Sequence, residues 1–281
     1  MSSQDSKQIL LPPDLHTHSA YCGHAQGTME ASISRAVDLG LSGIGFSGHF
    51  PYPDGYREPV ADAVIPADKF PDFVHEVLDL REKYTCIPVY FAVEIDYIEG
   101  FMDQIQQKLK DLPVDYILGS VHIVQNVMID HSEEMLDKHM EAMGGQEGIW
   151  EKYWEAIEAL INLDLCDIVS HLDLPKKFLQ TLKAPVYYER VEQILSLIKA
   201  KNMVLEVNSG GVDRALENEP YPSRKILEMA YEKKIEITLG SDAHCPGEVG
   251  RYFQQMIDLV KTLGWQSLVY FKNRKKHVYN L

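Results

Sequence analysis

The sequence predicts an α/β fold in which parallel strands and their helices form one closed barrel. Short runs rich in β-branched and aromatic residues alternate with longer amphipathic stretches along the chain, a pattern typical of strand–helix–strand units around a parallel sheet. Roughly seven such units follow one another in 281 residues, and no Pro-, Gly- or Ser-rich linker separates them. One barrel is therefore a simpler interpretation than two open sheets, and a chain of this length can bury a large core.

The predicted strands begin with the apolar run that leads into Asp14. Six further strands are predicted at residues 43–47, 87–93, 116–121, 167–170, 203–207 and 235–240. Amphipathic spacing predicts helices between them, at residues 29–39, 70–84, 150–163, 191–200, 223–233 and 250–263. The first helix has the clearest boundaries, because Thr28 can cap its N-terminus and Gly40 follows its last turn.

Residues 123–148 depart from this alternation. Their helical periodicity is weak and is broken at Met143-Gly144-Gly145. Long insertions after a strand are more often lids or substrate loops than core. We therefore expect residues 1–281 to form a single barrel domain with a lid insertion at about 123–148.

Charge and composition narrow the choice of partners and compartment. The chain carries 27 Lys and Arg against 42 Asp and Glu, a formal net charge of −15, which disfavours binding to nucleic acid. Its four cysteines form no close pair, as expected in a reducing compartment. Residues 1–8 contain no signal-peptide core, and no apolar run approaches the ~20 residues that span a bilayer. We expect a cytoplasmic monomer or homodimer without a nucleic-acid or membrane partner.

Nearly every predicted strand ends in a histidine or a carboxylate. In a parallel α/β barrel these ends share one face, and that face carries the active site. Residues two apart on a strand point the same way, so His16 and His18 can hold one ion. The same spacing joins Asp242 and His244, and His24 lies in a polar turn that can reach this face. The candidate metal ligands are His16, His18, His24, His49, Glu94, His122, His171, Asp242 and His244.

A single histidine at a strand end is more often a hydrogen-bonded core residue than a ligand. Metal-type ligands at six strand ends, however, are hard to explain by packing. These nine side chains exceed what one tetrahedral ion needs. They suit two or three divalent or trivalent transition-metal ions, and the ligand set accepts zinc, iron or manganese.

The order of these motifs resembles the PHP (polymerase and histidinol phosphatase) superfamily of metal-dependent phosphoesterases. The resemblance runs from about residue 14 to residue 244 and covers all nine candidate ligands. Within the superfamily the chain is most similar to the histidinol-phosphatase branch. The matching stretches are Gly48-His49-Phe50, Val93-Glu94-Ile95-Asp96-Tyr97, Gly119-Ser120-Val121-His122, Ser170-His171-Leu172-Asp173-Leu174, Glu206-Val207-Asn208-Ser209-Gly210 and Pro220-Tyr221-Pro222.

The resemblance implies a distorted (β/α)7 barrel with a trinuclear metal site at the C-terminal ends of the strands. It implies three ligand groups: His16, His18, Glu94 and Asp242; a bridging Glu94 with His122 and His171; and His24, His49 and His244. The implied activity is hydrolysis of a small phosphomonoester, above all L-histidinol phosphate in histidine biosynthesis. Asp242 is the candidate proton-handling ligand. Asp14 and Asp96 can orient a ligating imidazole or cap a turn.

The phosphate-binding residues are less clear from the sequence. Arg214 matches a position that the family uses on substrate phosphate, which gives it a binding and a catalytic role. Family members often carry an arginine after the fifth strand, where this chain has Lys176 and Lys177. A lysine supplies charge without the bidentate fork of arginine. The alternative functions are a PHP phosphoesterase for nucleotides or nucleic-acid ends, which the net charge disfavours, and a non-catalytic metal-binding regulatory module.

Overall fold

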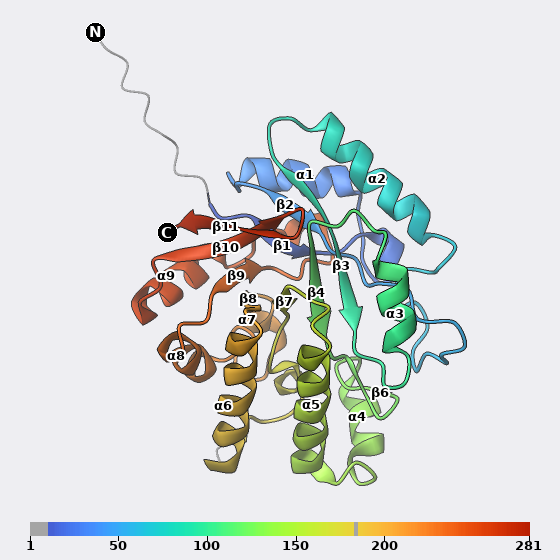
Figure 1. The fold of residues 1–281 in the computed structure, drawn as a ribbon, viewed down its shortest axis with the longest axis vertical. Helices are drawn as coiled ribbons and strands as arrows, with labels where there is room; N and C mark the ends of the chain where they lie inside the picture. Colours follow the sequence, from blue (N-terminus) through green and yellow to red (C-terminus); the bar gives the residue numbers. More distant parts are fainter. Residues whose placement is uncertain (1–10, 183–184) are drawn as a thin grey trace.

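The computed structural model describes residues 11–182 and 185–281, and its centre is a sheet of parallel strands (Figure 1). Seven strands lie in the order β1-β2-β3-β4-β7-β8-β9. Their bounds are β1 Asp14–Thr17, β2 Ile44–Phe46, β3 Val89–Asp96, β4 Tyr116–Ser120, β7 Ile168–Val169, β8 Val204–Asn208 and β9 Ile237–Gly240. The first and last strands meet at the parallel bridge between Thr17 and Ala243. The sheet is therefore a nearly closed barrel, which confirms the predicted fold class.

Helices surround the barrel (Figure 1). Their bounds are α1 Met29–Asp38, α2 Phe70–Lys83, α3 Met102–Leu109, α4 Glu133–Met140, α5 Gly145–Asn162, α6 Pro185–Ala200, α7 Gly211–Arg214, α8 Arg224–Glu232 and α9 Phe253–Leu263. α1 shows why the periodic stretches become helices. The Thr28 hydroxyl accepts a hydrogen bond from the Ala31 backbone N–H, and Met29, Ile33 and Ala36 are buried on one face. Within the described ranges no helix is long and apolar enough to cross a membrane.

A C-terminal hairpin closes the barrel end opposite the predicted site. It consists of β10 (Ser267–Lys272) and β11 (Lys275–Asn280). Val269 and Phe271 of β10 join the apolar cluster inside the barrel. The turn is fixed by Asp115, at the start of β4, because its side chain accepts from the Asn273 N–H at 2.9 Å. The sequence pattern did not predict this hairpin.

The segment after His122 has defined structure. β5 (Ile123–Val124) and β6 (Val127–Met128) form a small antiparallel hairpin, followed by α4. The Ile129 N–H donates to the His122 carbonyl at 2.9 Å, so the hairpin folds back beside that histidine. α5 begins at Gly145, earlier than the predicted 150, because the Gly144-Gly145 pair adopts positive φ angles of 88° and 74° and turns the chain into the helix.

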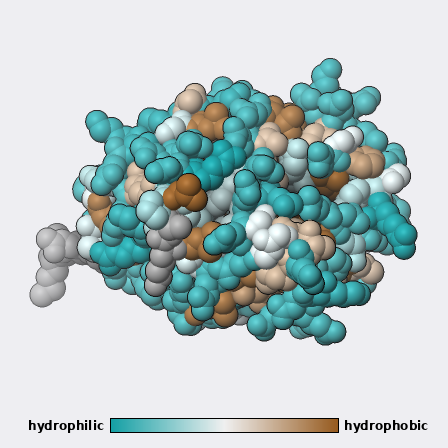
Figure 2. Space-filling model, turned by 90° about the horizontal axis from the view of Figure 1, so that it is seen from below, coloured by the Kyte–Doolittle hydropathy of each residue, from teal (hydrophilic) through white to brown (hydrophobic). Residues whose placement is uncertain are grey.

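The polar ends of the strands lie opposite the C-terminal hairpin. β7 has only two residues, and β1 and β2 change register between Asp14 and Thr17, which accounts for the distortion of the barrel. His171 and Asp242 adopt left-handed φ angles of 22° and 54°. Such conformations cost energy for residues other than glycine and cluster at functional sites. The surface seen from below is mainly hydrophilic, with scattered hydrophobic residues (Figure 2).

Candidate metal centre

A cavity opens at the C-terminal ends of the barrel strands. Six of the predicted ligands line it: His24, His49, His122, His171, Asp242 and His244. The other three, His16, His18 and Glu94, lie at its base and are at most 4% exposed. The structure thus brings all nine residues to one place, although they come from six separate strand ends and one turn.

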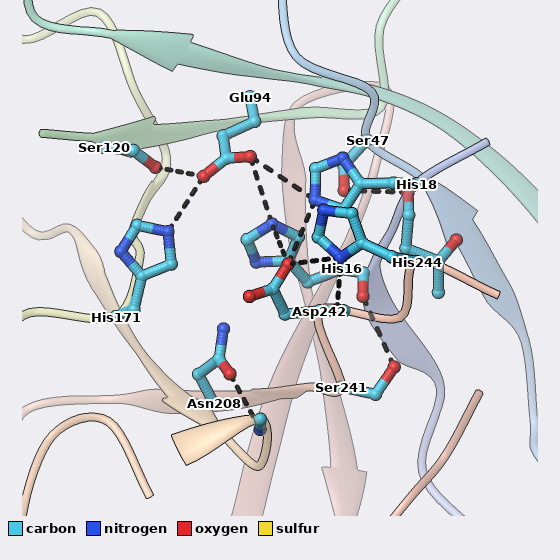
Figure 3. A network of polar contacts seen from close by, with 12 residues as sticks. His16, His18, Ser47, Glu94, Ser120, His171, Asn208, Ser241, Asp242 and His244 are labelled. Atoms are coloured by element: carbon cyan, nitrogen blue, oxygen red, sulfur yellow. Dashed lines mark hydrogen bonds and ion pairs between the residues drawn. The ribbon is translucent and has the colours of Figure 1, made fainter. Parts of the chain in front are cut away.

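One group combines the end of β1 with the loop after β9. His18 Nε2 lies 3.1 Å from Asp242 Oδ1, and His16 Nε2 lies 3.8 Å from the same oxygen. Both imidazoles also face Glu94 Oε2, at 3.3 Å from His16 and 3.5 Å from His18 (Figure 3). The ligand atoms of His16, His18 and Asp242 lie within 4.8 Å of one another, close enough to share one ion.

Glu94, near the end of β3, stands between two groups of histidines. Its Oε2 lies 3.0 Å from His49 Nδ1, and its Oε1 lies 2.9 Å from His171 Nε2 and 3.6 Å from His122 Nε2. The Ser120 hydroxyl donates to Oε1 at 2.5 Å. Burial opposes ionisation, but the surrounding histidines hold the pKa of Glu94 well below its usual range. The two oxygens of Glu94 therefore face different groups of histidines, as a carboxylate that bridges two ions requires.

The remaining histidines lie above this carboxylate. The rings of His49 and His244 each stack on His18 with centroids 4.3 Å apart. His24 is exposed at the rim, and its Nε2 lies 3.1 Å from His244 Nε2. Its Nδ1 is 3.0 Å from the Asp62 carbonyl, which turns Nε2 toward the cavity.

Unsatisfied buried atoms show that this donor set fits metal ions. His16 Nε2, His18 Nε2 and His49 Nδ1 lie 3.0–3.5 Å from Glu94 Oε2, and none of these four buried atoms has a hydrogen-bond partner among the described residues. Buried polar atoms are rarely left in this state. Four overlapping groups of three residues place one ligand atom each within 4.8 Å of the others. Nitrogen and carboxylate donors of this kind suit zinc and related ions.

Carboxylates outside this set orient the imidazoles. Glu206, at the end of β8, pairs with His16 Nδ1 at 2.7 Å and accepts from the His171 N–H at 2.8 Å. Asp96 pairs with His122 Nδ1 at 2.8 Å. Such contacts fix the ring orientation of metal-binding histidines. Asp14 instead accepts from the backbone N–H groups of residues 241 and 250, and so holds the loop after β9.

Gly240 in β9 makes room for the contact between Glu206 and His16. A Cβ atom at Gly240 would lie 2.1 Å from Glu206 Oε1 and 2.6 Å from His16 Cβ. All three residues are fully buried at this point. Only a glycine at position 240 of β9 therefore leaves room for the Glu206 side chain of β8 to reach His16 of β1.

Arg214 lies at the end of α7 and lines the cavity. Its Nη1 donates to Asp242 Oδ2 at 2.7 Å, and its Nη2 donates to the Asp242 carbonyl at 3.0 Å and lies 3.4 Å from Glu248 Oε2. Burial works against the Asp242 carboxylate, but Arg214 and His16 hold its pKa well below the usual range. Asp242 thus presents Oδ1 to the histidines and Oδ2 to Arg214.

The two lysines of the 3-10 turn Leu174–Lys177 occupy different places. Lys176 is 0% exposed, donates to the Pro220 carbonyl and pairs with Asp173 Oδ2 at 3.1 Å; it does not line the cavity. Lys177 lines the cavity, and its Nζ donates to the Asp130 carbonyl at 2.6 Å. In this arrangement Lys177, and not Lys176, can reach a ligand directly.

Sequence reasoning missed several residues of the cavity wall. Tyr52, Asp130, His131 and Tyr221 all line it. Asp130 and His131 follow the β5–β6 hairpin inside the insertion predicted at about 123–148, but neither is among the predicted site residues. Tyr221 belongs to a recognised motif, Pro220-Tyr221-Pro222, which was the one available signal.

The fold and site define the class: a parallel α/β-barrel protein whose strand ends gather histidines and carboxylates that could hold metal ions. A protein-family model, described as the PHP domain, matches residues 14–210. The chain belongs to this family, as the order of its motifs predicts.

Curated relatives cover almost the whole chain. A protein of Deinococcus radiodurans named "Probable histidinol-phosphatase" is 30% identical over 263 residues, which are 93% of this chain and 97% of that protein. The histidinol-phosphatase of Bacillus subtilis is 26% identical, with 87% and 98% covered. A crystal structure of the histidinol phosphate phosphatase of Lactococcus lactis, complexed with Zn, L-histidinol and phosphate, has a TM-score of 0.81 at 21% identity and covers 95% of this chain and 99% of that one. This last similarity supports the fold.

Proposed function

We propose that this protein is a metal-dependent phosphomonoesterase that hydrolyses L-histidinol phosphate to L-histidinol and inorganic phosphate. The observation that carries the proposal is the convergence of buried histidine nitrogens on the carboxylates of Glu94 and Asp242, several of them without a hydrogen bond among the described residues. The names of the curated relatives supply the substrate. The net charge of −15 is compatible with a substrate that carries an amine and an imidazole.

The proposed ligand groups are those that the family resemblance implies. His16, His18, Glu94 and Asp242 would hold one ion; Glu94, His122 and His171 a second; His24, His49 and His244 a third. The structure supports the first group by placing ligand atoms of His16, His18 and Asp242 within 4.8 Å of one another, and it places His18 equally near His49 and His244. Ions bound there supply an activated water near neutral pH and charge stabilisation for the phosphoryl oxygens. Zinc, iron and manganese are the candidate metals.

The chain itself binds and orients the phosphate in this proposal. Arg214 offers a planar guanidinium to the phosphoryl oxygens, and Asp242 Oδ2 fixes its position. Lys177 adds a second positive charge on the other side of the cavity. Asp242 is the proposed proton-handling group, because its carboxylate lies between the ligand histidines and Arg214.

Residues 123–148 take part in substrate enclosure within a single-domain protein. Met128, Asp130 and His131 line the cavity, whereas Leu136 and Met143 anchor the segment in the core. We propose that the β5–β6 hairpin and the turn after it form a wall of the substrate site.

A phosphate-release screen tests the proposed function. Metal-loaded protein is offered L-histidinol phosphate, other small phosphomonoesters, nucleotides and 3′- or 5′-phosphorylated oligonucleotides. The highest kcat/KM is expected for L-histidinol phosphate. A preference for nucleotides or oligonucleotides would favour the phosphoesterase alternative. No metal-dependent release from any monoester would point to a regulatory module instead.

A further inference from the structure

Tyr221 lines the metal-site cavity, and its buried hydroxyl group has no hydrogen-bond partner among the described residues. The residue is 1% exposed, and its side chain lines the cavity together with Arg214 and Asp242. Among the described residues, none forms a hydrogen bond with its Oη. Because a buried hydroxyl without a partner is unfavourable, we expect a ligand to supply one.

The position of the Tyr221 ring is fixed from several sides. Its backbone N–H donates to the Asn208 carbonyl at 3.0 Å, and its carbonyl accepts from the Asn208 N–H at 2.7 Å. Lys176 Nζ lies 5.1 Å from the ring centroid and holds the neighbouring Pro220 carbonyl. The His171 ring meets it edge-on at 6.4 Å. The buried Lys176 therefore acts as a support for this ring.

The charges around the hydroxyl determine what it can bind. Burial, together with Asp173, Asp130 and Asp242, raises the pKa of Tyr221 above its usual value, against the opposing effect of Arg214. The group therefore stays protonated at neutral pH and acts as a hydrogen-bond donor. A ligand that satisfies it must bring an acceptor oxygen into a cavity that already contains Arg214.

We propose that Tyr221 Oη donates a hydrogen bond to a non-bridging phosphoryl oxygen of the bound substrate, beside Arg214. This inference rests on the proposed phosphatase function and adds to it a neutral donor for the phosphate. A donor fixed before binding stabilises charge on the phosphoryl oxygens without reorganisation. Tyr221 is neither one of the nine predicted metal ligands nor one of the predicted phosphate-binding residues.

Tyr187 offers a matched control. It is 2% exposed, and its hydroxyl is also buried without a hydrogen-bond partner among the described residues. Its ring packs against Trp150 and Trp154, however, and it does not line the cavity. Tyr187→Phe therefore measures the effect of losing a buried tyrosine hydroxyl that lies outside the cavity.

The experiment compares metal-loaded wild type, Tyr221→Phe and Tyr187→Phe. Three quantities are measured: the Kd of inorganic phosphate by calorimetry, kcat/KM for L-histidinol phosphate, and metal content with the melting temperature. Tyr221→Phe is expected to weaken phosphate binding and to lower kcat/KM, each by about ten- to a hundredfold, as for a lost hydrogen bond to a charged group. Metal content and melting temperature stay at the wild-type values, and Tyr187→Phe stays within about twofold of wild type.

An unchanged phosphate Kd in Tyr221→Phe would overturn the inference. Loss of bound metal in that variant would also overturn it, because the hydroxyl would then support the metal groups and not the phosphate. Phosphate binding does not depend on turnover. A wild type that binds phosphate but does not hydrolyse L-histidinol phosphate would therefore contradict the proposed function alone.

Discussion

At the scale of single residues, Glu94 joins the parts of the site. Its two oxygens face different histidines, and the Ser120 hydroxyl holds one of them. A neutral amide in its place would keep the shape but could not bridge two cations. The role of Glu94 therefore depends on its charge, which its neighbours maintain despite burial.

Glu94→Gln is expected to lose activity by at least about a hundredfold, because replacing groups that merely support a ligand already costs 10–100-fold. The readouts are kcat/KM and metal content by elemental analysis. His75→Ala serves as the control, since the His75 side chain is 80% exposed on α2. Near-wild-type turnover of Glu94→Gln with all metals bound would contradict the bridging role.

Arg214→Ala is expected to lower kcat/KM by one to two decades, because one charge-assisted contact contributes about 1.5–3 kcal/mol. Arg214→Lys should recover only part of this loss, since an ammonium cannot form the guanidinium fork. Arg224→Ala is the control, because its side chain is exposed and pairs with Glu228 on α8, away from the cavity lining. Full kcat/KM in Arg214→Ala would assign the phosphate to Lys177 instead.

Arg251 is unsuitable as a silent control, although the sequence places it at the start of the helix predicted at 250–263, where a substitution should have little effect. Its side chain is 10% exposed and donates to the Ser241 carbonyl at 3.1 Å. It also lies 3.3 Å from both Asp213 and Glu248. This network holds the loop that carries Asp242.

The structure gathers the predicted metal-type residues at one end of the barrel because all of them except His24 stand at the end of an apolar run. Residues two apart on a strand point the same way, and parallel strands end on the same face of the barrel. The position of such a residue in the sequence is therefore enough to predict that its side chain lies at the C-terminal face. Asp130, Lys177 and Tyr221 are different, since their places depend on how loops fold back over the barrel. No local pattern could separate the cavity-lining Lys177 from the buried Lys176 one position earlier.

At the scale of elements, the strands and long helices follow the hydrophobic pattern closely. The predicted strand at 116–121 corresponds to β4 at Tyr116–Ser120, and the predicted helix at 70–84 corresponds to α2 at Phe70–Lys83. The elements that were missed, α3, α4 and the β10–β11 hairpin, are short or strongly charged. Their apolar residues pack against partners distant in sequence, so local periodicity carries little signal for them.

A substitution at Gly240 tests how the packing of the strands positions the metal-site residues. Gly240→Ala is expected to lower the free energy of unfolding by about 1–3 kcal/mol, as for overpacking of a core, and to weaken metal retention. The new methyl group would meet the Glu206 carboxylate that orients His16. Chemical denaturation and elemental analysis measure the two effects.

Gly247→Ala is the matched control for this change. Its Cβ would meet no atom closer than 4.0 Å, from Cys245, and its backbone does not require glycine. Equal stability and equal metal content in Gly240→Ala and Gly247→Ala would show that the contact of Glu206 in β8 with His16 in β1 does not need a glycine at position 240.

At the scale of the whole molecule, the two ends of the barrel have different roles: one contributes to stability, and the other carries the candidate metal site. One end is filled by apolar side chains and closed by the β10–β11 hairpin. The other end collects histidines and carboxylates, several of whose buried atoms lack hydrogen-bond partners within the described part of the chain. Burying these polar groups lowers the free energy of unfolding, and bound cations would offset that loss.

Metal stoichiometry coupled to activity tests the central claim most directly. Protein purified without chelator is analysed for its elements, and phosphate release from L-histidinol phosphate is measured before chelation, after it and after metal is restored. We predict more than one transition-metal ion per chain, with activity that disappears on chelation and returns on reconstitution. One ion or fewer per chain in fully active protein, or activity that survives complete removal of the metals, would contradict a polynuclear phosphatase site.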